Sequence, residues 1–236
     1  MTSPRRPDTV DEELLEAEAA DVLSLSSDEQ RVHRMAAEMR AAFRTLAGVD
    51  RGVAVFGSAR TPAGHPEYEL ARATARQLGE AGLSVITGGG PGVMEAANRG
   101  AREAGAPSIG VGIELPSHRE RRNPYVDVWV ECHYFFVRKV MFLRYASGFV
   151  VFPGGFGTLD ELFEALTLDQ TGKVRHFPIV LMEPAYWEGL VGWVRERMVA
   201  EGKASPADLE LFDVCDEPGE CVRRLVAASE RRRLVA

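Results

Sequence analysis

The sequence has little cysteine, no excess of positive charge and no long apolar run. Its three cysteines, Cys132, Cys215 and Cys221, show no C-x-x-C spacing, which favours a reducing cytoplasm and argues against a zinc site. A membrane-spanning helix needs about 18 or more apolar residues in succession, and no run in this chain approaches that length. A secretory signal peptide is not expected either, because the acidic segment DEELLEAEAAD follows Arg5 and Arg6.

The charge balance argues against a protein that binds nucleic acid. Lys and Arg number 28 against 35 Asp and Glu, which gives a formal net charge of -7. Affinity for a phosphate backbone comes from clustered Lys and Arg. The run at 231–233 is too short to provide it and is interpreted as a solvated tail. We therefore expect neither nucleic acid nor a membrane among the partners.

The pattern of apolar residues predicts an α/β fold. From Arg51 onward, short apolar runs alternate with stretches of helical periodicity. Apolar strands separated by helices indicate a parallel sheet covered on both faces. We expect a doubly wound, Rossmann-like sheet that binds ligands at the carboxyl ends of its strands. The predicted strands are 53–57, 83–87, 108–113, 126–130, 148–152, 178–182 and 211–215, and the predicted helices are 66–81, 91–104, 134–147, 159–170, 186–201 and 218–228.

Two regions are predicted along the chain. Residues 1–50 form an amino-terminal extension, and residues 51–236 form a single Rossmann-like domain. The first ten residues are predicted to be disordered, because they combine proline, serine and arginine without periodicity. A helix is predicted at 28–47, where Ser27 and Gln30 match a capping box.

Two glycine-containing loops follow the first two predicted strands. FGSAR places Ser58 directly after strand 53–57, where the backbone can approach a ligand and a hydroxyl is available. TGGGPGVMEAANRGA places Gly88, Gly89 and Gly90 before a helix whose free N–H groups point back at the loop. A tight turn alone would need one or two glycines, so we interpret the second loop as an anion cradle.

A third loop, PGGFGT, repeats this arrangement later in the chain. It places Gly154, Gly155, Gly157 and the hydroxyl of Thr158 at a helix amino terminus. Two such loops at adjacent strand ends suggest a phosphorylated small molecule lying across both. The third loop fails G-x-G-x-x-G at its third glycine, and no G-x-x-x-x-G-K-[ST] occurs. Neither NAD nor ATP is therefore expected.

Two acids accompany the glycine loops, Glu161 after the third and Glu95 at the matching depth after the second. A structural interpretation is available, because T-x-x-E is a capping box in which Glu161 returns a hydrogen bond to the N–H of Thr158. A functional interpretation is also available. Two carboxylates near an anion site are costly unless a cation or a positively charged transition state is stabilised there.

Cleavage of an N-glycosidic bond develops such a charge, because the ribose becomes oxocarbenium-like as the base departs. The phosphate of a nucleoside monophosphate would occupy the glycine loops, and Glu161 would act on the sugar. The segment HYFFVRKVMFLRYASG adds Arg138 and Lys139 on a helix just before the strand of the third loop. A cation there can hold phosphate or assist the leaving base.

Taken together, GGGPGVMEAANRGA, FFVRK and PGGFGTLDE resemble the Lonely Guy family, the cytokinin riboside 5′-monophosphate phosphoribohydrolases, often labelled lysine decarboxylases. The resemblance covers roughly residues 51–200. It implies hydrolysis of a nucleoside 5′-monophosphate, such as AMP or an N6-substituted AMP, to free base and ribose 5-phosphate. It also implies that the enzyme uses no metal or cofactor and forms a homodimer or an assembly of dimers.

The resemblance also implies roles for individual residues. Arg138 and Glu161 correspond to the catalytic pair, and Lys139 completes the Arg-Lys motif. Glu95 corresponds to an acid of longer, bacterial-type members that looks suited to holding ribose hydroxyls. The phosphate-binding turn corresponds to Gly154, Gly155, Gly157 and Thr158.

One departure and two alternatives accompany the resemblance. Plant-type members usually carry Met-His where this chain has Phe135-Phe136-Val137, so plain AMP or wider nucleotide salvage competes with cytokinin as the expected substrate. A lysine decarboxylase would need a Schiff-base lysine, for which Lys139 and Lys173 are the main candidates, without the usual cofactor context. A molybdenum cofactor carrier would bind a phosphorylated pterin without turnover, but the presence of both Arg138 and Glu161 argues against a pure carrier.

Overall fold

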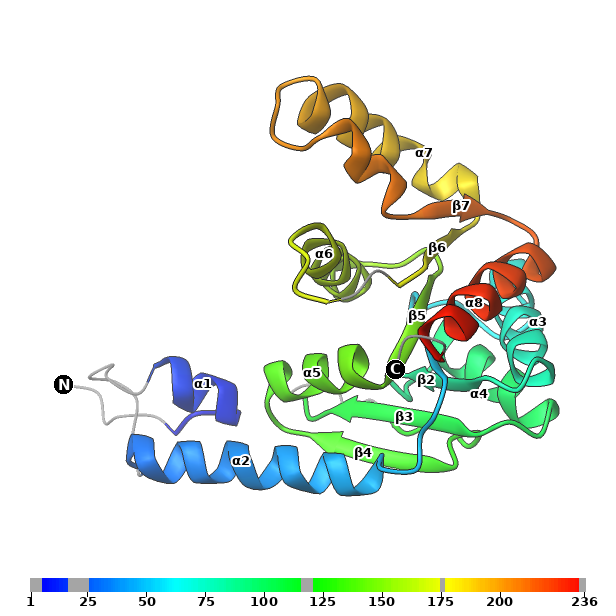
Figure 1. The fold of residues 1–236 in the computed structure, drawn as a ribbon. Coiled ribbons are helices and arrows are strands. Elements are labelled where there is room, and N and C mark those ends of the chain that lie inside the picture. Colours follow the sequence, from blue (N-terminus) through cyan, green and yellow to red (C-terminus); the bar gives the residue numbers. More distant parts are fainter. Residues whose placement is uncertain (1–5, 17–25, 116–120, 175–176, 234–236) are drawn as a thin grey trace.

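Seven parallel strands form one sheet in the order β4-β3-β2-β1-β5-β6-β7 (Figure 1). The computed structural model of the chain describes residues 6–16, 26–115, 121–174 and 177–233. The strands are β1 Gly52–Phe56, β2 Ser84–Thr87, β3 Ser108–Ile113, β4 Val128–Cys132, β5 Ala146–Val151, β6 Ile179–Met182 and β7 Asp213–Cys215. β1 pairs with both β2 and β5, so the strand order reverses beside β1. In open parallel sheets, ligands bind at such a switch point.

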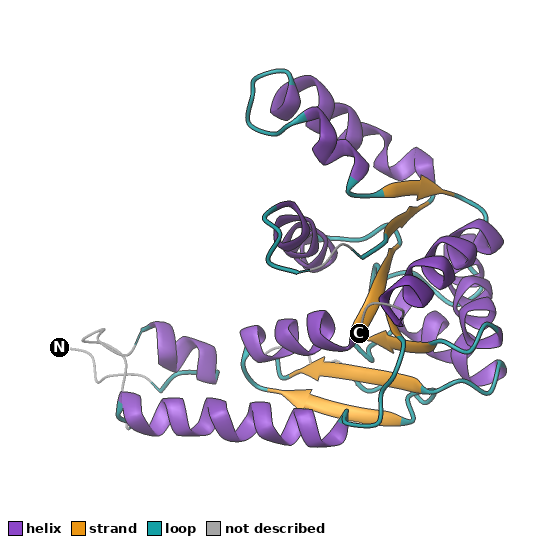
Figure 2. Cartoon of the chain, viewed as in Figure 1, coloured by secondary structure: helices purple, strands orange, loops and turns teal. Residues whose placement is uncertain are grey.

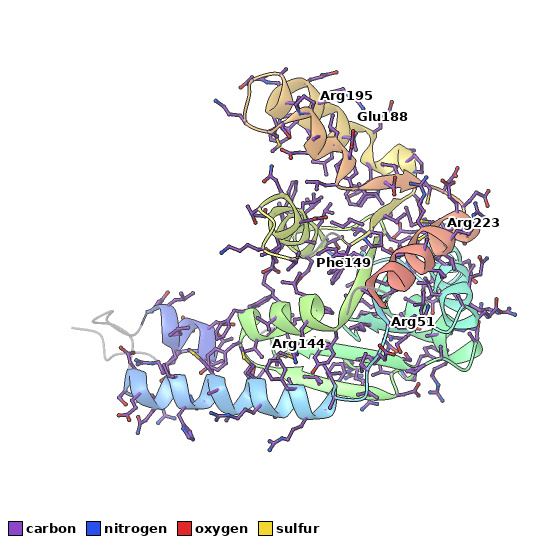
Figure 3. All side chains as sticks on the ribbon, viewed as in Figure 1. Arg51, Arg144, Phe149, Glu188, Arg195 and Arg223 are labelled. Atoms are coloured by element: carbon purple, nitrogen blue, oxygen red, sulfur yellow. The ribbon has the colours of Figure 1, made fainter. Side chains whose placement is uncertain are left out.

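Helices cover both faces of the sheet, as Figure 2 shows. One face carries α2 Asp28–Thr45, α5 Phe135–Tyr145, α6 Phe156–Gln170 and α7 Pro184–Trp193, and the other carries α3 Pro66–Glu80, α4 Val93–Glu103 and α8 Pro218–Arg233. Successive residues of a strand point to opposite faces. Phe149 on β5 (Figure 3) accordingly packs in the first core, and Val150 packs in the second.

The remaining elements are short. A helix α1, Val10–Leu15, precedes α2, a π-helical segment, Val194–Val199, continues α7, and a 3₁₀ turn, Pro206–Glu210, precedes β7. None of the helices in the described part of the chain is long and apolar enough to cross a lipid bilayer.

The structure confirms the doubly wound α/β class and the capping box of α2. The Ser27 hydroxyl accepts from the Gln30 N–H at 3.3 Å, and the Gln30 side chain accepts from the Ser27 N–H at 2.9 Å. The prediction of disorder up to Val10 is wrong at that residue, because Val10 begins α1 after the Thr9 cap. Residues 1–5 lie outside the described residues.

Several predicted boundaries move by two or three residues. The predicted helix 134–147 ends at Tyr145, because Ala146 already pairs with β1 as the first residue of β5. The predicted strand 126–130 is β4, Val128–Cys132. The predicted helix 159–170 begins earlier, at Phe156, and this shift changes the interpretation of the site. The predicted tail at 231–233 forms the end of α8.

Candidate active site

A cavity of about 540 Å³ opens where β1, β2 and β5 end. A backbone hydrogen bond joins the first and third loops, because the Ser58 N–H donates to the Pro153 carbonyl at 2.9 Å. The cavity is lined by Phe56, Gly57, Ser58, Ala59, Arg60, Gly88, Met94, Phe135, Arg138, Phe142, Gly155, Phe156, Gly157, Thr158, Asp160 and Glu161. The structure thus brings Gly88 and Met94 of the second motif together with residues of the other two loops and of α5.

The third loop supplies an open helix amino terminus. Gly155 is the N-cap of α6 and has no side chain to cap the helix, so the N–H groups of 156–158 lack an intrahelical acceptor. A Cβ atom built on Gly155 or Gly157 would meet no atom within 4 Å. These two glycines are therefore not required by packing, and they leave space for an anion at the positive end of the helix dipole.

Gly154 lies outside this lining. It borders a neighbouring cavity of about 390 Å³ that shares Ser58 and Arg60 with the first. Its carbonyl accepts from the Tyr186 hydroxyl of α7 at 2.6 Å. Gly154 thus ties the third loop to α7, whereas Gly155 and Gly157 face the main cavity.

The capping-box interpretation of Glu161 is wrong. Because α6 begins at Phe156, Thr158 lies inside its first turn and Glu161 lies in the next turn. Thr158 and Glu161 are 6% and 8% exposed, respectively, and both line the cavity. The carboxyl of Glu161 is consequently placed one turn beyond the helix terminus and is directed to the cavity.

Burial raises the pKa of Glu161 to about 7, against the opposing positive charges of Lys139 and Arg138. The nearest cation is the Lys139 ammonium, whose Nζ lies 3.7 Å from Glu161 Oε2. A carboxyl held this way is poised between its neutral and charged forms near neutral pH. Such tuning is a property of residues that act as general acids or bases.

Lys139 is held among three carboxylates of α6. Its Nζ lies 2.9 Å from both Asp160 Oδ2 and Glu164 Oε2. Burial opposes its charged form, but the hydrogen bonds to Asp160 and Glu164 and the charge of Glu161 outweigh burial and raise the pKa of Lys139. Lys139 does not line the cavity, and it links α5 to α6 as an ammonium ion.

Arg138 reaches the cavity from the first turn of α5. Its Nε donates to the Val111 carbonyl of β3 at 3.0 Å, and its guanidinium carbon lies 5.5 Å from the centre of the Phe142 ring. These two contacts fix the plane of the guanidinium. A Cβ atom at Gly88 would overlap Arg138 Nη2 and Met94 Sδ, so the absence of a side chain at Gly88 makes the space for Arg138.

Gly88→Ala is therefore expected to displace Arg138 and lower the catalytic efficiency by about 10- to 100-fold, because small misplacements of positioned groups have effects of that size. The hydrolysis of AMP that the sequence predicts, assayed with the purified variant, measures this effect. Gly189→Ala on α7 is the matched control, since its new Cβ would meet no atom within 4 Å. Equal activity of the two variants would contradict this account of Gly88.

The other glycines of the second loop serve its scaffold. Gly89 has φ +74°, which a side chain would disfavour, and its N–H donates to Thr87 Oγ1 at 2.8 Å. The Asn123 amide donates to the carbonyls of Gly89 and Gly90, each at 3.0 Å. It also donates to the buried Asn98 at 2.9 Å. A buried amide network thus fixes the loop, and only Gly88 of the three glycines borders the cavity.

Glu95 is also placed outside the lining of the cavity. It lies in the first turn of α4, and its Oε1 accepts from the Tyr68 hydroxyl of α3 at 3.1 Å. The predicted contact of Glu95 with ribose hydroxyls stays a prediction.

Several lining residues were not among the site residues predicted from the sequence. Arg60 follows Ser58 by two residues, and its N–H donates to Ser58 Oγ at 3.0 Å, so its position in the first loop was a usable signal for a second cation. Phe142 lies one helical turn after Arg138, as the helical spacing indicates. Phe135 and Phe156 line the cavity at the starts of two different helices, and that juxtaposition depends on tertiary structure.

Comparisons with known proteins place this chain among related sequences. The family model described as possible lysine decarboxylase matches residues 94–225. Cytokinin riboside 5′-monophosphate phosphoribohydrolase of Mycobacterium tuberculosis is 31% identical over 74% of this chain and 92% of its own length. Pyrimidine/purine nucleotide 5′-monophosphate nucleosidase of Escherichia coli is 35% identical over 50% of this chain but only 28% of its own length.

The fold is also that of a solved structure with low sequence identity. The Moco carrier protein from Chlamydomonas reinhardtii superposes with a TM-score of 0.54 at 22% identity, covering 75% of this chain and 98% of the carrier. At that identity the likeness concerns the fold alone. The family match, the phosphoribohydrolase relative and the three motifs together show that this chain belongs to the Lonely Guy family.

Proposed function

We propose that this chain hydrolyses the N-glycosidic bond of a nucleoside 5′-monophosphate, AMP or an N6-substituted AMP, to free base and ribose 5-phosphate. One observation carries the proposal. A single cavity joins the open amino terminus of α6, which suits a phosphate, to the buried carboxyl of Glu161 and the guanidinium of Arg138. The names of the relatives, a phosphoribohydrolase and a nucleotide nucleosidase, support the same reaction class.

The substrate phosphate would occupy the amino terminus of α6. The N–H groups of 156–158 and the Thr158 hydroxyl are donors there, and Ser58 and Arg60 face the same cavity from the first loop. A phosphate bound this way places the ribose toward Glu161, one turn further along α6. The base would then lie among the aromatic side chains of α5, which include Phe135 and Phe142.

The chemistry follows from these positions. As the bond between the ribose carbon and the base nitrogen breaks, positive charge develops on the sugar, and the Glu161 carboxylate stabilises it. Glu161 also accepts a proton from the water that attacks this carbon. The Arg138 guanidinium stabilises negative charge on the departing base, which takes up a proton. One water molecule is consumed, and the products are the free base and ribose 5-phosphate.

The activity should rise with pH across neutrality. Burial raises the pKa of Glu161 to about 7, and the proposed role needs the ionised carboxylate. Below that pKa, kcat/KM is expected to fall about tenfold for each pH unit. Lys139→Met should shift this fall in kcat/KM to higher pH, because the positive charge of Lys139 lowers the pKa of Glu161. Initial rates with AMP from pH 5 to 8.5 test both points, and a flat wild-type profile would contradict the role of Glu161.

We further infer that the working form is a homodimer. Phe135, Phe136, Phe156 and Phe163 on α5 and α6 are 43%, 37%, 92% and 37% exposed. Exposed apolar clusters mark interaction surfaces, and two of these side chains also line the cavity. A second copy against α5 and α6 would bury them and exclude water from the site. The three free cysteines, all buried, support the cytoplasmic location that we infer.

Decarboxylation of lysine is less well supported. A Schiff base needs a neutral amine, but Lys139 is held as an ammonium by Asp160 and Glu164. Lys173 is exposed and does not line the cavity. A carrier without turnover would have no use for a carboxyl with its pKa tuned to about 7 beside the ligand. Hydrolysis therefore accounts for more features of the site than decarboxylation or a carrier function does.

The direct test incubates the purified protein with AMP, N6-isopentenyl-AMP and a panel of other nucleoside monophosphates. Free base and ribose 5-phosphate are separated by chromatography. Adenosine is the matched control, because it lacks the phosphate that the amino terminus of α6 would hold. Base release from at least one monophosphate and none from adenosine is expected. Tight binding without release from any of them would favour a carrier instead.

A further inference from the structure

The helix that carries Arg138 has no cap of its own. The N-cap residue of α5, Tyr134, makes no capping hydrogen bond with its side chain. The first turn of α5, all of which the structure describes, contains no acidic residue. A helix start leaves backbone N–H donors without intrahelical acceptors and bears partial positive charge. The segment FFVRKVMFLRY therefore supplies no capping acceptor of its own at the start of α5.

The amino-terminal extension supplies the missing acceptors. Glu38 of α2 accepts from the N–H groups of His133 and Tyr134 at 3.0 and 3.2 Å, and its other oxygen lies 2.9 Å from His133 Nδ1. Asp11 of α1 accepts from the Phe135 N–H at 3.2 Å. Three successive N–H groups are thus bound by carboxylates that precede them by 95 to 124 residues in the sequence.

The extension is itself anchored to make these contacts. Glu13 of α1 pairs with Arg34 of α2 at 2.9 Å, and Ala42 and Leu46 are buried in the core that α2 shares with α5. This anchoring holds α1 against α2 and places Asp11 beside the start of α5.

The far end of α5 also contacts α2. The Tyr145 hydroxyl donates to the Phe43 carbonyl at 3.3 Å, and the Arg144 guanidinium carbon lies 4.8 Å from the centre of the Phe43 ring. Figure 3 labels Arg144 on α5. The extension therefore contacts both ends of the helix that contributes to the cavity.

The first turn of α5, which Glu38 and Asp11 cap, also lines the cavity. Phe135, whose N–H is bound by Asp11, lines the cavity. The Arg138 N–H donates to the Tyr134 carbonyl at 3.3 Å, so Arg138 lies a single turn from the residues bound by Glu38. A change in this turn would move Arg138 relative to Val111 and Phe142.

We propose that the amino-terminal extension is a positioning element of the active site, in which Glu38 and Asp11 cap α5 and thereby hold Arg138 in its catalytic place. The kinetic part of this inference rests on the proposed hydrolase function. Neither acid lines the cavity, so both are positioning residues rather than catalytic ones.

The test uses full-length Glu38→Ala, Glu38→Gln and Asp11→Asn, with Glu29→Gln as the matched control. Glu29 lies exposed in the first turn of the same helix α2. Glu38→Ala is expected to lower kcat for AMP by about tenfold or more, because catalytic groups tolerate little displacement. Glu38→Gln keeps one acceptor oxygen and should recover part of this loss, and Asp11→Asn should have a smaller effect. Glu29→Gln should match the wild type.

The thermal unfolding midpoint and the concentration of folded protein are measured for each variant. These measurements distinguish a loss of folded protein from a decrease in kcat. If kcat per folded Glu38→Ala molecule equals that of Glu29→Gln, the extension does not position Arg138 and the inference is overturned.

Hydrogen exchange gives a second measurement that does not depend on activity. The amides of 133–135 and the Nε proton of Arg138 should exchange faster in Glu38→Ala than in Glu29→Gln, because their acceptors are lost or displaced. Unchanged exchange would overturn the inference even in an active enzyme. If the wild type releases no base from any monophosphate but the exchange rates change as expected, the hydrolase proposal fails and the capping of α5 stands.

Discussion

Glu161→Gln is expected to lower the turnover number for AMP by about 1,000-fold or more while it leaves the dissociation constant within a few-fold, since it removes a charge needed chiefly in the transition state. The amide keeps the shape of the side chain and leaves the amino terminus of α6 intact for phosphate. Single-turnover base release and equilibrium AMP binding measure the two quantities separately.

Glu164→Gln is the matched control, because it makes the same charge change on the same helix outside the lining of the cavity. Its turnover should stay within about tenfold of the wild type, as expected for a change that affects the site only through Lys139. If Glu161→Gln retained the turnover of Glu164→Gln, Glu161 would have no role in the reaction.

The same substitution should stabilise the fold at alkaline pH. The folded chain keeps a proton on Glu161 up to about pH 7, whereas the ordinary pKa is 4.5. Between these values the folded state binds more protons than the unfolded state, so the free energy of unfolding falls as the pH rises. Glutamine cannot ionise, and Glu161→Gln should therefore be more stable than the wild type at pH 8 by on the order of 2 kcal/mol. Urea unfolding at pH 8 and pH 4.5 measures this difference, which should shrink at the lower pH.

Arg138→Ala is expected to lower kcat/KM for AMP by about 100-fold or more, as the removal of a preorganised charged donor does in other active sites. The guanidinium is held in place by the Val111 carbonyl and the Phe142 ring, and alanine supplies no donor at that position. Arg138→Lys should recover only part of the rate, because an ammonium group cannot reproduce the planar set of N–H donors of a guanidinium.

Arg76→Ala, which removes an exposed arginine from α3, controls for the loss of one positive charge and should match the wild type. Nearly full activity in Arg138→Ala would remove this residue from the site. Base release at saturating and limiting AMP separates its effect on kcat from its effect on KM.

The fold was predictable because its signals are local. Apolar runs such as VAVFG and PIVLM are long enough to be strands buried on both faces, and capping signals such as Ser27 with Gln30 mark a helix start directly. The start of α6 was misplaced because Gly155 caps it without a side chain. The sequence Thr158-Leu-Asp-Glu161 offered a stronger local signal, and that signal was misleading.

The candidate site was predictable where neighbours in sequence are neighbours in space. Gly155, Gly157, Thr158 and Glu161 fall on one helix start, and all line the cavity. The separate roles of the glycines in the second loop could not be predicted in this way. The function of Gly89 depends on Asn123, which lies 34 residues away and binds its carbonyl from a different loop. Single-sequence patterns carry no information about such a partner.

The contact between Glu38 and the start of α5 has a consequence for the newly made chain. Ribosomes add roughly 5 to 20 residues per second, and 95 residues separate Glu38 from His133. The helix α2 therefore leaves the ribosome several seconds before its partner in α5 exists. During that interval its apolar residues Ala42 and Leu46, buried in the finished core, lack β4 and α5, the elements that α2 contacts in the folded chain. The helix that caps the start of α5 is thus made well before the helix that it caps.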